Sequence, residues 1–320
     1  MRNKLYLVIP CYNEEEVLRE TAKRLVNKLN DMINKGLVSK ESKILFVNDG
    51  SKDKTWSIIK ELFNDHEQIL GINLSRNRGH QNALLAGLME AKEHADMTIS
   101  LDADLQDDIE VLDKFVEEYL TGSDIVYGVR SSRATDTVFK RTTALGFYKF
   151  MKILGVDVIY NHADYRLMSK RALEGLSEFK EVNLFLRGIV PLIGYKYSIV
   201  KYERHERFAG ESKYPLKKML AFAWEGITSL SIKPIRIITA LGLLIFLFSL
   251  VMLGYILIMN FMDKTVSGWS SLGVSIWMLG GIQLLSVGII GEYIGKIYME
   301  TKSRPKYILS EKLLEKDKEK

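Results

Sequence analysis

Cysteine is nearly absent from this chain of 320 residues, since Cys11 is the only one. A single cysteine excludes an intrachain disulfide and is typical of a protein in a reducing compartment such as the cytosol. Neither sign of charge dominates, because the formal net charge is only +5, which gives little support to a nucleic-acid partner. The Gly-x-Gly-x-x-Gly fingerprint of dinucleotide-binding proteins does not occur. The first apolar run, Leu5–Ile9, is too short for a signal-peptide core and predicts a strand.

Charge is also missing from most of residues 235–298, and this indicates membrane-spanning helices. Ile235–Met259 contains one charged residue, Arg236, and Leu272–Ile290 contains none. A bilayer core needs roughly 20 apolar residues per helix, so each run can span it. Buried core helices are the alternative, but they are rarely this long or apolar on every face. We therefore expect two transmembrane helices, at 235–259 and 272–294, within a hairpin of residues 234–298.

The positive charges that flank this hairpin predict its orientation. Lysine and arginine precede the first run and follow the second, whereas the loop between the runs contains only Lys264. The positive-inside rule then places residues 1–214 and a tail of residues 299–320 in the cytoplasm. This predicts a multi-pass protein of the cell (inner or plasma) membrane with a cytoplasmic catalytic domain. The mixed charges of residues 311–320 are typical of a solvated, frayed end.

Two further features concern the membrane and self-association. Residues 215–233 are expected to form an amphipathic helix, because apolar residues recur there at helical spacing. Such a helix can lie in the membrane interface, and packing against the soluble domain is the alternative. On the second span, Gly291 and Gly295 have the small-xxx-small spacing that lets helices approach closely, which predicts a homo-oligomer.

The soluble part alternates short apolar runs with helical patterns, and this predicts an α/β fold with a mainly parallel sheet. The expected helices include 82–93 and 111–120, and the expected strands are Leu5–Ile9, Ile44–Val47, Ile69–Leu74, Met97–Leu101 and Ile125–Val129. Ligands bind at the carboxyl ends of strands in such sheets. Polar residues fall at those ends, and they include Asn13, Asp49, Arg76 and the pair Asp102 and Asp104.

The aspartate pair after the fourth strand predicts a metal site. Asp102 and Asp104 are two residues apart, and alternation along a strand would point both side chains to one side. Two adjacent carboxylates repel each other unless a cation lies between them. Hard oxygen ligands suit Mg²⁺ or Mn²⁺, which usually also bind substrate phosphates, so we expect an enzyme that handles a diphosphate. A solvated acidic loop is the alternative.

Four motifs in order resemble the inverting family 2 glycosyltransferases, which have a GT-A domain that binds nucleotide sugars. They are VIPCYNEE at 8–15, VNDGSKDKT at 47–55, LSRNRGHQNALLAG at 74–87 and LDADLQDD at 101–108. The added hairpin resembles the polyprenyl-phosphate glycosyltransferases, relatives of dolichol-phosphate mannose synthase. The chain departs from many relatives at Asp108, where they have proline, and this is expected to alter only the local turn.

The resemblance implies a role for most of these polar residues. Asp49 would contact the nucleobase, although it could instead be a simple turn residue before Gly50. Asp104 would bind the metal, and Asp102 would help to position the metal or the sugar. The nucleotide and sugar-diphosphate pocket would be completed by Pro10, Tyr12, Asn13, Glu14, Arg76, Asn77, Gly79 and His80.

Downstream segments would serve the acceptor. Asp164, in the segment 164–172, is often assigned as a catalytic base in the family. A phosphate monoester has a second pKa of about 6 and hardly needs deprotonating, so Asp164 is expected to orient Arg166 or a sugar hydroxyl. Arg166 is then a phosphate-binding candidate, with a structural Asp164–Arg166 ion pair as the alternative. The loop at 204–214 would hold the lipid phosphate through Arg204, Arg207 and Lys213, and generic attraction to anionic headgroups is its alternative.

Together these features predict transfer of one sugar, with inversion, from a nucleotide sugar to a polyprenyl phosphate such as undecaprenyl phosphate. UDP is favoured over GDP as the nucleotide only through the resemblance to bacterial members with two spans. Some relatives are tetramers, so the expected homo-oligomer could be a tetramer. The lipid-linked sugar would serve cell-envelope modification across the membrane, which implies a separate flippase. One alternative is a processive polysaccharide synthase, which usually has a Gln-x-x-Arg-Trp motif that is absent here. A catalytically inactive nucleotide-binding scaffold is the other.

Overall fold

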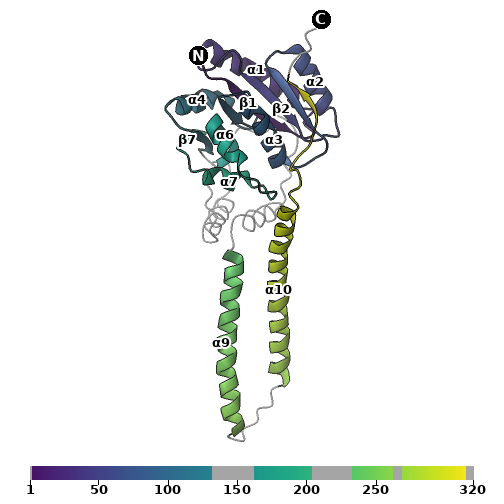
Figure 1. The fold of residues 1–320 in the computed structure, drawn as a ribbon, viewed down its shortest axis with the longest axis vertical. Helices are drawn as coiled ribbons and strands as arrows, with labels where there is room; N and C mark the ends of the chain where they lie inside the picture. The colour runs from purple at the N-terminus through teal and green to yellow at the C-terminus, as the bar shows by residue number, and fades with distance from the viewer. Residues whose placement is uncertain (1, 132–161, 204–232, 262–268, 315–320) are drawn as a thin grey trace. The chain divides into compact units, whose positions relative to one another are not determined.

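The computed structural model describes residues 2–131, 162–203, 233–261 and 269–314 (Figure 1). The chain divides into two units by its internal contacts. One unit holds a mixed sheet with its covering helices and includes the C-terminal segment from Arg304. The other unit holds the two long helices near the C-terminus.

The sheet unit alternates strands with helices along most of its length. Its helices are α1 (Leu18–Asn34), α2 (Thr55–Asp65), α3 (His80–Lys92), the 3₁₀ helix η1 (Ile109–Val111), α4 (Leu112–Leu120), α6 (Lys170–Ser177) and α7 (Leu186–Leu192). Its strands are β1 (Leu5–Cys11), β2 (Lys43–Asn48), β3 (Ile69–Leu74), β4 (Met97–Ser100), β5 (Ile125–Arg130), β6 (His162–Ser169), β7 (Tyr197–Tyr202) and β8 (Leu309–Leu313). All five strands expected from the sequence are present; Ile69–Leu74 has the expected bounds, and the other four differ by one or two residues.

The 8-stranded sheet has the order β7-β5-β6-β4-β1-β2-β3-β8. Strands β4, β1, β2 and β3 pair in parallel, as do β5 and β7. Strand β6 is antiparallel to both of its neighbours, and β8 is antiparallel to β3. The predicted parallel arrangement therefore holds for the first four strands, whereas β6 and β8 make the complete sheet mixed.

Helices cover both faces of this sheet, because alternate side chains of each strand enter different cores. Leu5, Leu7 and Ile9 of β1 lie in a core with α1, α2 and α4, whereas Tyr6 and Val8 lie in a core with α3, α6 and α7. Gly87 brings α3 close to the second face, since a Cβ there would lie 2.5 Å from Val8 Cγ1. The sheet thus has two buried faces, and its polar strand ends are left at the edge.

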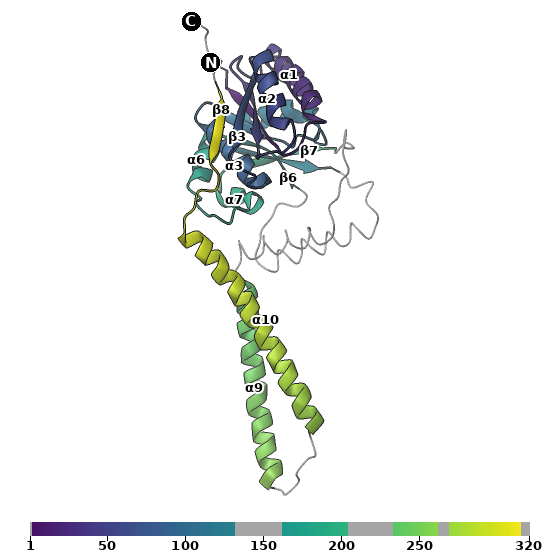
Figure 2. The ribbon, with the colours of Figure 1, turned by 90° about the vertical axis from the view of Figure 1, so that its right-hand side faces the viewer.

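The C-terminal segment differs from the frayed end expected from its mixed charges. Residues Leu309–Leu313 form β8, which pairs along β3, with Gly71 opposite Leu313 (Figure 2). Trp56 Nε1 donates to Glu311 Oε2 at 3.0 Å, and Lys312 Nζ lies 2.7 Å from Glu90 Oε2. The prediction was wrong for the residues of β8, because their charges are paired with α2 and α3 while Leu309 and Leu313 pack on the core.

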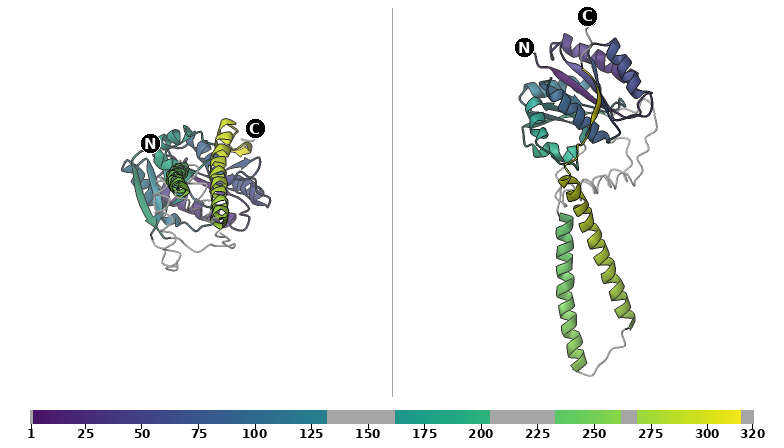
Figure 3. Two further views of the ribbon diagram at one scale, coloured as in Figure 1. Left: turned by 90° about the horizontal axis from the view of Figure 1, so that it is seen from below. Right: turned by 45° about the vertical axis from the view of Figure 1, so that its right-hand side comes forward.

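The second unit contains α9 (Lys233–Phe261) and α10 (Trp269–Thr301), which run antiparallel (Figure 3). Within the described residues, no helix is both long enough and apolar enough to cross a membrane. The juxtamembrane helix expected at 215–233 lies outside the described residues, except for Lys233, which begins α9.

Candidate functional site

Asp49 follows β2 and ties three segments together at the carboxyl edge of the sheet. Its backbone N–H donates to Cys11 O at 2.9 Å, and its buried carboxylate accepts from the backbone N–H groups of Arg78 at 2.7 Å and Gly79 at 2.9 Å. Burial raises the pKa of the Asp49 carboxyl, although these two donors oppose the effect. Asp49 therefore holds the loop before α3 against the ends of β1 and β2.

Gly50 allows this close approach. Its φ of +62° lies in the left-handed region, and a Cβ at this position would lie 2.5 Å from the backbone carbonyl carbon of Arg76. Because any other residue would collide with that backbone, the loop carrying Arg76 can pack directly on the turn after β2. The exposed side chain of Arg76 starts from this packed loop.

The loop after β1 is bonded to the loop after β2. Asn13, with φ of +54°, donates its backbone N–H to Ser51 Oγ at 3.0 Å and accepts from the Lys52 N–H at 2.9 Å. The Glu14 N–H donates to Thr55 Oγ1 at 2.9 Å. Pro10 is buried within β1, whereas Tyr12 is exposed. These predicted nucleotide-site residues thus lie on one connected edge with Asp49.

Asp102 and Asp104 lie in a turn rather than on the strand. Strand β4 ends at Ser100, so strand alternation does not align the two side chains as expected from the sequence. Asp104 is buried, and its Oδ1 accepts from the Gln106 N–H at 3.2 Å. Asp102 is more open, and its Oδ1 lies 3.0 Å from Nε2 of His80, the first residue of α3. The turn gives the carboxylates different surroundings, which the regular alternation of a strand would not do.

The His80–Asp102 contact joins the start of α3 to the turn that carries Asp102 and Asp104, called the aspartate turn below. Desolvation by surrounding protein atoms would lower the pKa of His80, but the hydrogen bond and negative charge of Asp102 outweigh it and raise the pKa. The same contact lowers the pKa of Asp102 against the opposing effect of its own desolvation. Since Gly79 bonds to Asp49, a continuous connection runs from Asp49 through Gly79 and His80 to Asp102.

Asp107 adds a third carboxylate to this region that sequence reasoning did not assign. Burial, followed by the negative charge of Asp102, raises the pKa of Asp107 to about 6, and Asp104 adds to this. Its Oδ1 accepts from Tyr202 Oη at 2.6 Å, while its buried Oδ2 has no hydrogen-bond partner. Negative charge is therefore concentrated around the turn at 102–107.

This concentration of hard oxygen atoms fits a divalent cation. Among the described residues, no three His, Cys, Asp or Glu side chains are grouped closely enough to hold a metal by themselves. Mg²⁺ is nevertheless commonly bound through one or two carboxylates plus substrate phosphates. Asp102 and Asp104 are the residues that would supply those carboxylates.

Asp164, which was predicted to serve the acceptor, lies between two arginines. Its Oδ1 pairs with Arg166, and its Oδ2 accepts from Nε of Arg187 at 3.2 Å and from Nη2 at 3.0 Å. Burial alone would raise the pKa of Asp164, but the charges of Arg187 and Arg166 hold it well below its usual range. Asp164 stays ionised, and the buried Arg166 matches the structural ion pair considered above.

Arg187 is the residue of this cluster that the sequence did not reveal. It lies in the first turn of α7, within the run Leu-Phe-Leu-Arg-Gly at 184–188. A single arginine inside an apolar run was the available signal, but its partner Asp164 is 23 residues away in the chain. The positive charge of Arg187 partly offsets the rise in the pKa of His80 and adds to the lowering of the pKa of Asp102, so this cluster is electrostatically coupled to both residues.

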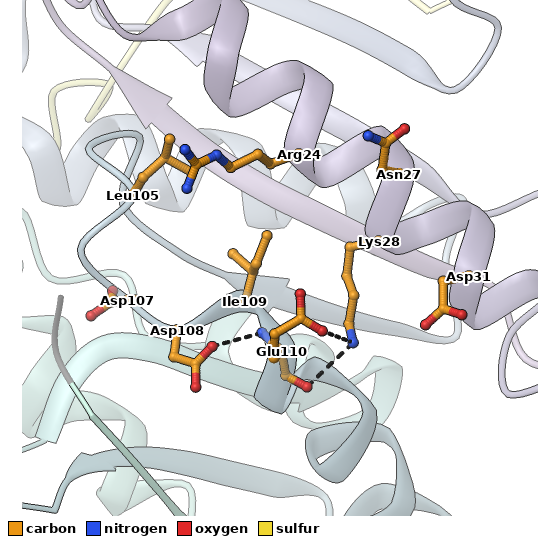
Figure 4. Close-up of a pocket in the computed structure, with 9 residues that line it drawn as sticks. All are labelled: Arg24, Asn27, Lys28, Asp31, Leu105, Asp107, Asp108, Ile109 and Glu110. Atoms are coloured by element: carbon orange, nitrogen blue, oxygen red, sulfur yellow. Dashed lines mark hydrogen bonds and ion pairs between the residues drawn. The ribbon is translucent and has the colours of Figure 1, made fainter. Parts of the chain in front are cut away.

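The other predicted phosphate ligands, Arg204, Arg207 and Lys213, lie outside the described residues. A pocket of about 430 Å³ lies between α1 and the segment 105–110 (Figure 4). Lys28 Nζ closes one side through Glu110, at 3.0 Å from Oε2 and 3.3 Å from the carbonyl oxygen. Asp107 lines this pocket, but none of the site residues predicted from the sequence does. The polar edge of the sheet, and not this pocket, is the candidate site.

Comparison with known proteins gives consistent matches along the chain. The family model described as Glycosyl transferase family 2 matches residues 6–177, and one described as the GtrB C-terminal hairpin matches residues 233–297. An uncharacterized glycosyltransferase of Bacillus subtilis (strain 168), YkoT, is 56% identical, with 95% of this chain and 90% of the relative covered. A prophage bactoprenol glucosyl transferase homolog of Escherichia coli (strain K12) is 42% identical, with 96% and 98% covered. The bactoprenol glucosyl transferase of Shigella phage SfV is 41% identical, with the same coverage.

Proposed function

Because the chain belongs to glycosyl transferase family 2, we propose that this glycosyltransferase moves one sugar from a nucleotide sugar to a polyprenyl phosphate. Relatives that match almost the whole chain are named bactoprenol glucosyl transferases, which supports a polyprenyl carrier as acceptor. The observation that carries the proposal has two parts. The Asp49 loop is bonded through Gly79 and His80 to Asp102, and the charges of Asp164 and Arg187 act on both His80 and Asp102. A donor site and an anion-binding acceptor site would share this edge.

On the donor side, Asp49 would contact the nucleobase, since a carboxylate accepts from the N–H of uracil or guanine. Pro10, Tyr12, Asn13 and Glu14 would line the nucleotide pocket, and Arg76, Gly79 and His80 would face the sugar diphosphate. UDP is the favoured nucleotide. Mg²⁺ or Mn²⁺, held by Asp102 and Asp104, would neutralise charge on the departing nucleoside diphosphate.

On the acceptor side, a phosphate oxygen would attack the anomeric carbon opposite the leaving diphosphate, so the configuration inverts. The acceptor is a dianion near neutral pH, so the step needs no proton removal. Asp164 is also a poor base, because Arg187 and Arg166 hold its pKa well below the usual range. Its proposed role is to orient its partners. Arg204, Arg207 and Lys213 are retained as further candidates for holding the lipid phosphate.

We also propose that residues 234–298 anchor the enzyme in the cell membrane, with residues 1–214 cytoplasmic. The uncharged runs and the match to the GtrB C-terminal hairpin support this proposal. So does the exposure of large apolar side chains on α9 and α10, including Leu243, Phe248 and Leu284, since water would disfavour them. The proposal has three further parts. Residues 215–233 would form a helix in the membrane interface, the glycines of α10 would mediate self-association, and a separate flippase would move the lipid-linked sugar across the membrane.

Topology can be tested with the native Cys11 replaced by serine. A cysteine introduced at Asn260 should react with a membrane-impermeant maleimide in intact cells. One introduced at Ser303 should react only after the cells are opened. Labelling of both positions in intact cells, or release of the protein by carbonate washing, would contradict the membrane proposal.

The reaction is tested with radiolabelled UDP- and GDP-sugars and undecaprenyl phosphate, with Mg²⁺, Mn²⁺ or EDTA. We expect one donor to give a lipid carrying a single inverted sugar in a metal-dependent reaction, and undecaprenol to give no product. A product of many sugars would support a processive synthase. Nucleotide binding without turnover of any donor would support a scaffold.

A further inference from the structure

Two arginines pair with Asp164, but their surroundings differ. The Arg166 side chain is 1% exposed, whereas the Arg187 side chain is 32% exposed. Arg166 extends between Asp164 and the backbone carbonyl of Leu186, to which its Nη1 donates at 3.4 Å. An arginine enclosed in this way supports the start of α7 and does not present its guanidinium to a ligand.

Arg187 is held in place through its neighbour as well as through Asp164. The Leu186 N–H donates to Gln81 Oε1 of α3 at 2.7 Å, and the Leu186 carbonyl accepts from Arg166. The side chain of Arg187 then gives both Nε and Nη2 to one oxygen of Asp164. These contacts fix the backbone and the guanidinium together, so little ordering is needed before a ligand binds.

Arg187 is the member of this cluster that a ligand can reach. Asp164 pairs with the guanidinium groups of both Arg166 and Arg187. Arg187 is the partly exposed member, and its charge acts on His80 and Asp102 across the site. Guanidinium groups bind phosphate oxygens with strong, directional hydrogen bonds. The partly exposed guanidinium of Arg187 can therefore reach a phosphate oxygen, whereas that of the buried Arg166 cannot.

We propose that Arg187 binds an anionic oxygen of the acceptor's phosphate monoester and that Asp164 is the positioning residue that aims it. This inference rests on the proposed function. In it, Arg187 and not Arg166 is the arginine of this cluster that contacts the acceptor. Arg166 takes the structural role. The shared chemistry is a phosphate monoester, and the lipid chain would be recognised elsewhere.

The test compares the full-length Arg187→Ala and Arg187→Lys variants with the wild type, each in the same detergent. Arg171→Ala is the matched control, because Arg171 is an exposed arginine paired with Asp124 outside the site. The readouts are KM for undecaprenyl phosphate, KM for the donor, kcat, and calorimetric binding of UDP with Mn²⁺. Binding of farnesyl phosphate, farnesol and inorganic phosphate is measured in parallel, because it needs no donor.

Loss of a charge-assisted hydrogen bond is expected to raise KM for undecaprenyl phosphate by about 10- to 100-fold in Arg187→Ala. The binding of farnesyl phosphate should weaken in parallel. Arg187→Lys should recover part of the lost binding, because it keeps the positive charge. UDP binding and donor KM should be little changed, as should every readout of Arg171→Ala. If Arg187→Ala does not fold, the lysine variant and the farnesyl phosphate measurement carry the test.

Two results would overturn the inference alone. One is an unchanged lipid KM in Arg187→Ala, and the other is an equal rise in the donor and lipid KM values, which indicates a structural role. If the Arg187 variants bind inorganic phosphate and farnesyl phosphate equally more weakly than the wild type does, the result would still support a phosphate site at Arg187. A wild type that neither transfers sugar to undecaprenyl phosphate nor binds farnesyl phosphate would instead refute the proposed function, and this inference with it.

Discussion

The proposed donor and acceptor sides of the candidate site are held together by different interactions. On the donor side, the loops after β1 and β2 and the loop before α3 are joined mainly by backbone N–H groups that donate to Asp49, Asn13, Ser51 and Thr55. On the acceptor side, Asp164 is flanked by Arg166 and Arg187, and the contacts are ion pairs between side chains. One side is bonded mainly through backbone N–H groups, and the other is bonded through paired side-chain charges.

This difference has an energetic consequence. A hydrogen bond typically adds about 1 to 3 kcal/mol to stability, the higher values being for charged acceptors, whereas removing one partner of a buried ion pair costs about 3 to 5 kcal/mol. Substitutions on the donor side should therefore weaken nucleotide binding while the protein stays folded. Substitutions of the buried charges should affect folding and transfer together. Between the two sides lies the aspartate turn, where the charges are only partly compensated.

The largest effect is expected at that turn. Asp104→Ala should lower transfer about a thousandfold or more, because metal charge compensation is worth several kcal/mol and each 1.36 kcal/mol is tenfold in rate. The melting temperature should stay close to that of the wild type. Transfer assays with Mn²⁺ measure the effect, and Asp65→Ala, an exposed residue at the end of α2, is the control. Near-normal turnover would remove Asp104 from the metal site.

Asp164→Ala tests the acceptor side. It leaves Arg166 buried without its charge partner and should cost about 3 to 5 kcal/mol of unfolding free energy in urea melts. Asp49→Asn is the donor-side counterpart, and it should cost about 1 to 3 kcal/mol while weakening UDP binding. Equal losses in the two variants would show that the two sides do not differ in the way described above.

Asp107 predicts a pH dependence. Its folded pKa is raised to about 6, mainly by burial. Because the folded state holds this proton more tightly than the unfolded state, the stabilisation is fully present below about pH 4 and is lost as pH rises through 6. A shift of about 2 pKa units corresponds to about 3 kcal/mol. The gap in unfolding free energy between the wild type and Asp107→Asn should change by this amount between pH 4 and 7.

That comparison is made in EDTA, so that a bound cation does not lower the pKa of Asp107. Tyr202→Phe sharpens it, since loss of the hydrogen bond to Asp107 should raise the pKa further and move the transition to higher pH. Parallel pH profiles for the wild type and Asp107→Asn would mean that Asp107 is already ionised throughout this range.

The smallest effect is expected at the edge of the sheet where β8 pairs with β3. Glu311→Ala removes the contacts with Trp56 and Lys60. Because Glu311 and Lys60 are both well exposed, the loss should stay below about 1 kcal/mol in thermal melts. A loss as large as that of Asp164→Ala would show that this exposed pair contributes as much to stability as the buried ion pairs of Asp164.

Much of the fold followed from local patterns in the sequence. The five expected strands and the helices at 82–93 and 111–120 are present, because apolar runs and helical spacing act over a few residues. Strands β6, β7 and β8 were not expected. In β7 and β8 exposed residues alternate with less exposed ones, and β8 carries charges that are more typical of a tail.

The candidate site divides in the same way. The donor-side residues were predictable, because each stands at the end of an apolar run and belongs to a motif. The role of Arg166 was left open, and Arg187 was missed. Which arginine is buried depends on how α7 packs against α3 and β6, and no spacing along the chain carries that information.

By itself, then, the sequence determined the order of strands and helices, the polar strand ends, and the uncharged runs near the C-terminus. These depend on residue type and on periods of two to four residues. Only the tertiary structure decided that β8 returns to the sheet, that Asp102 contacts His80, and that Asp164 lies between two unequal arginines. Such contacts join residues 22 to more than 200 positions apart, and they form only when distant segments bury their surfaces together.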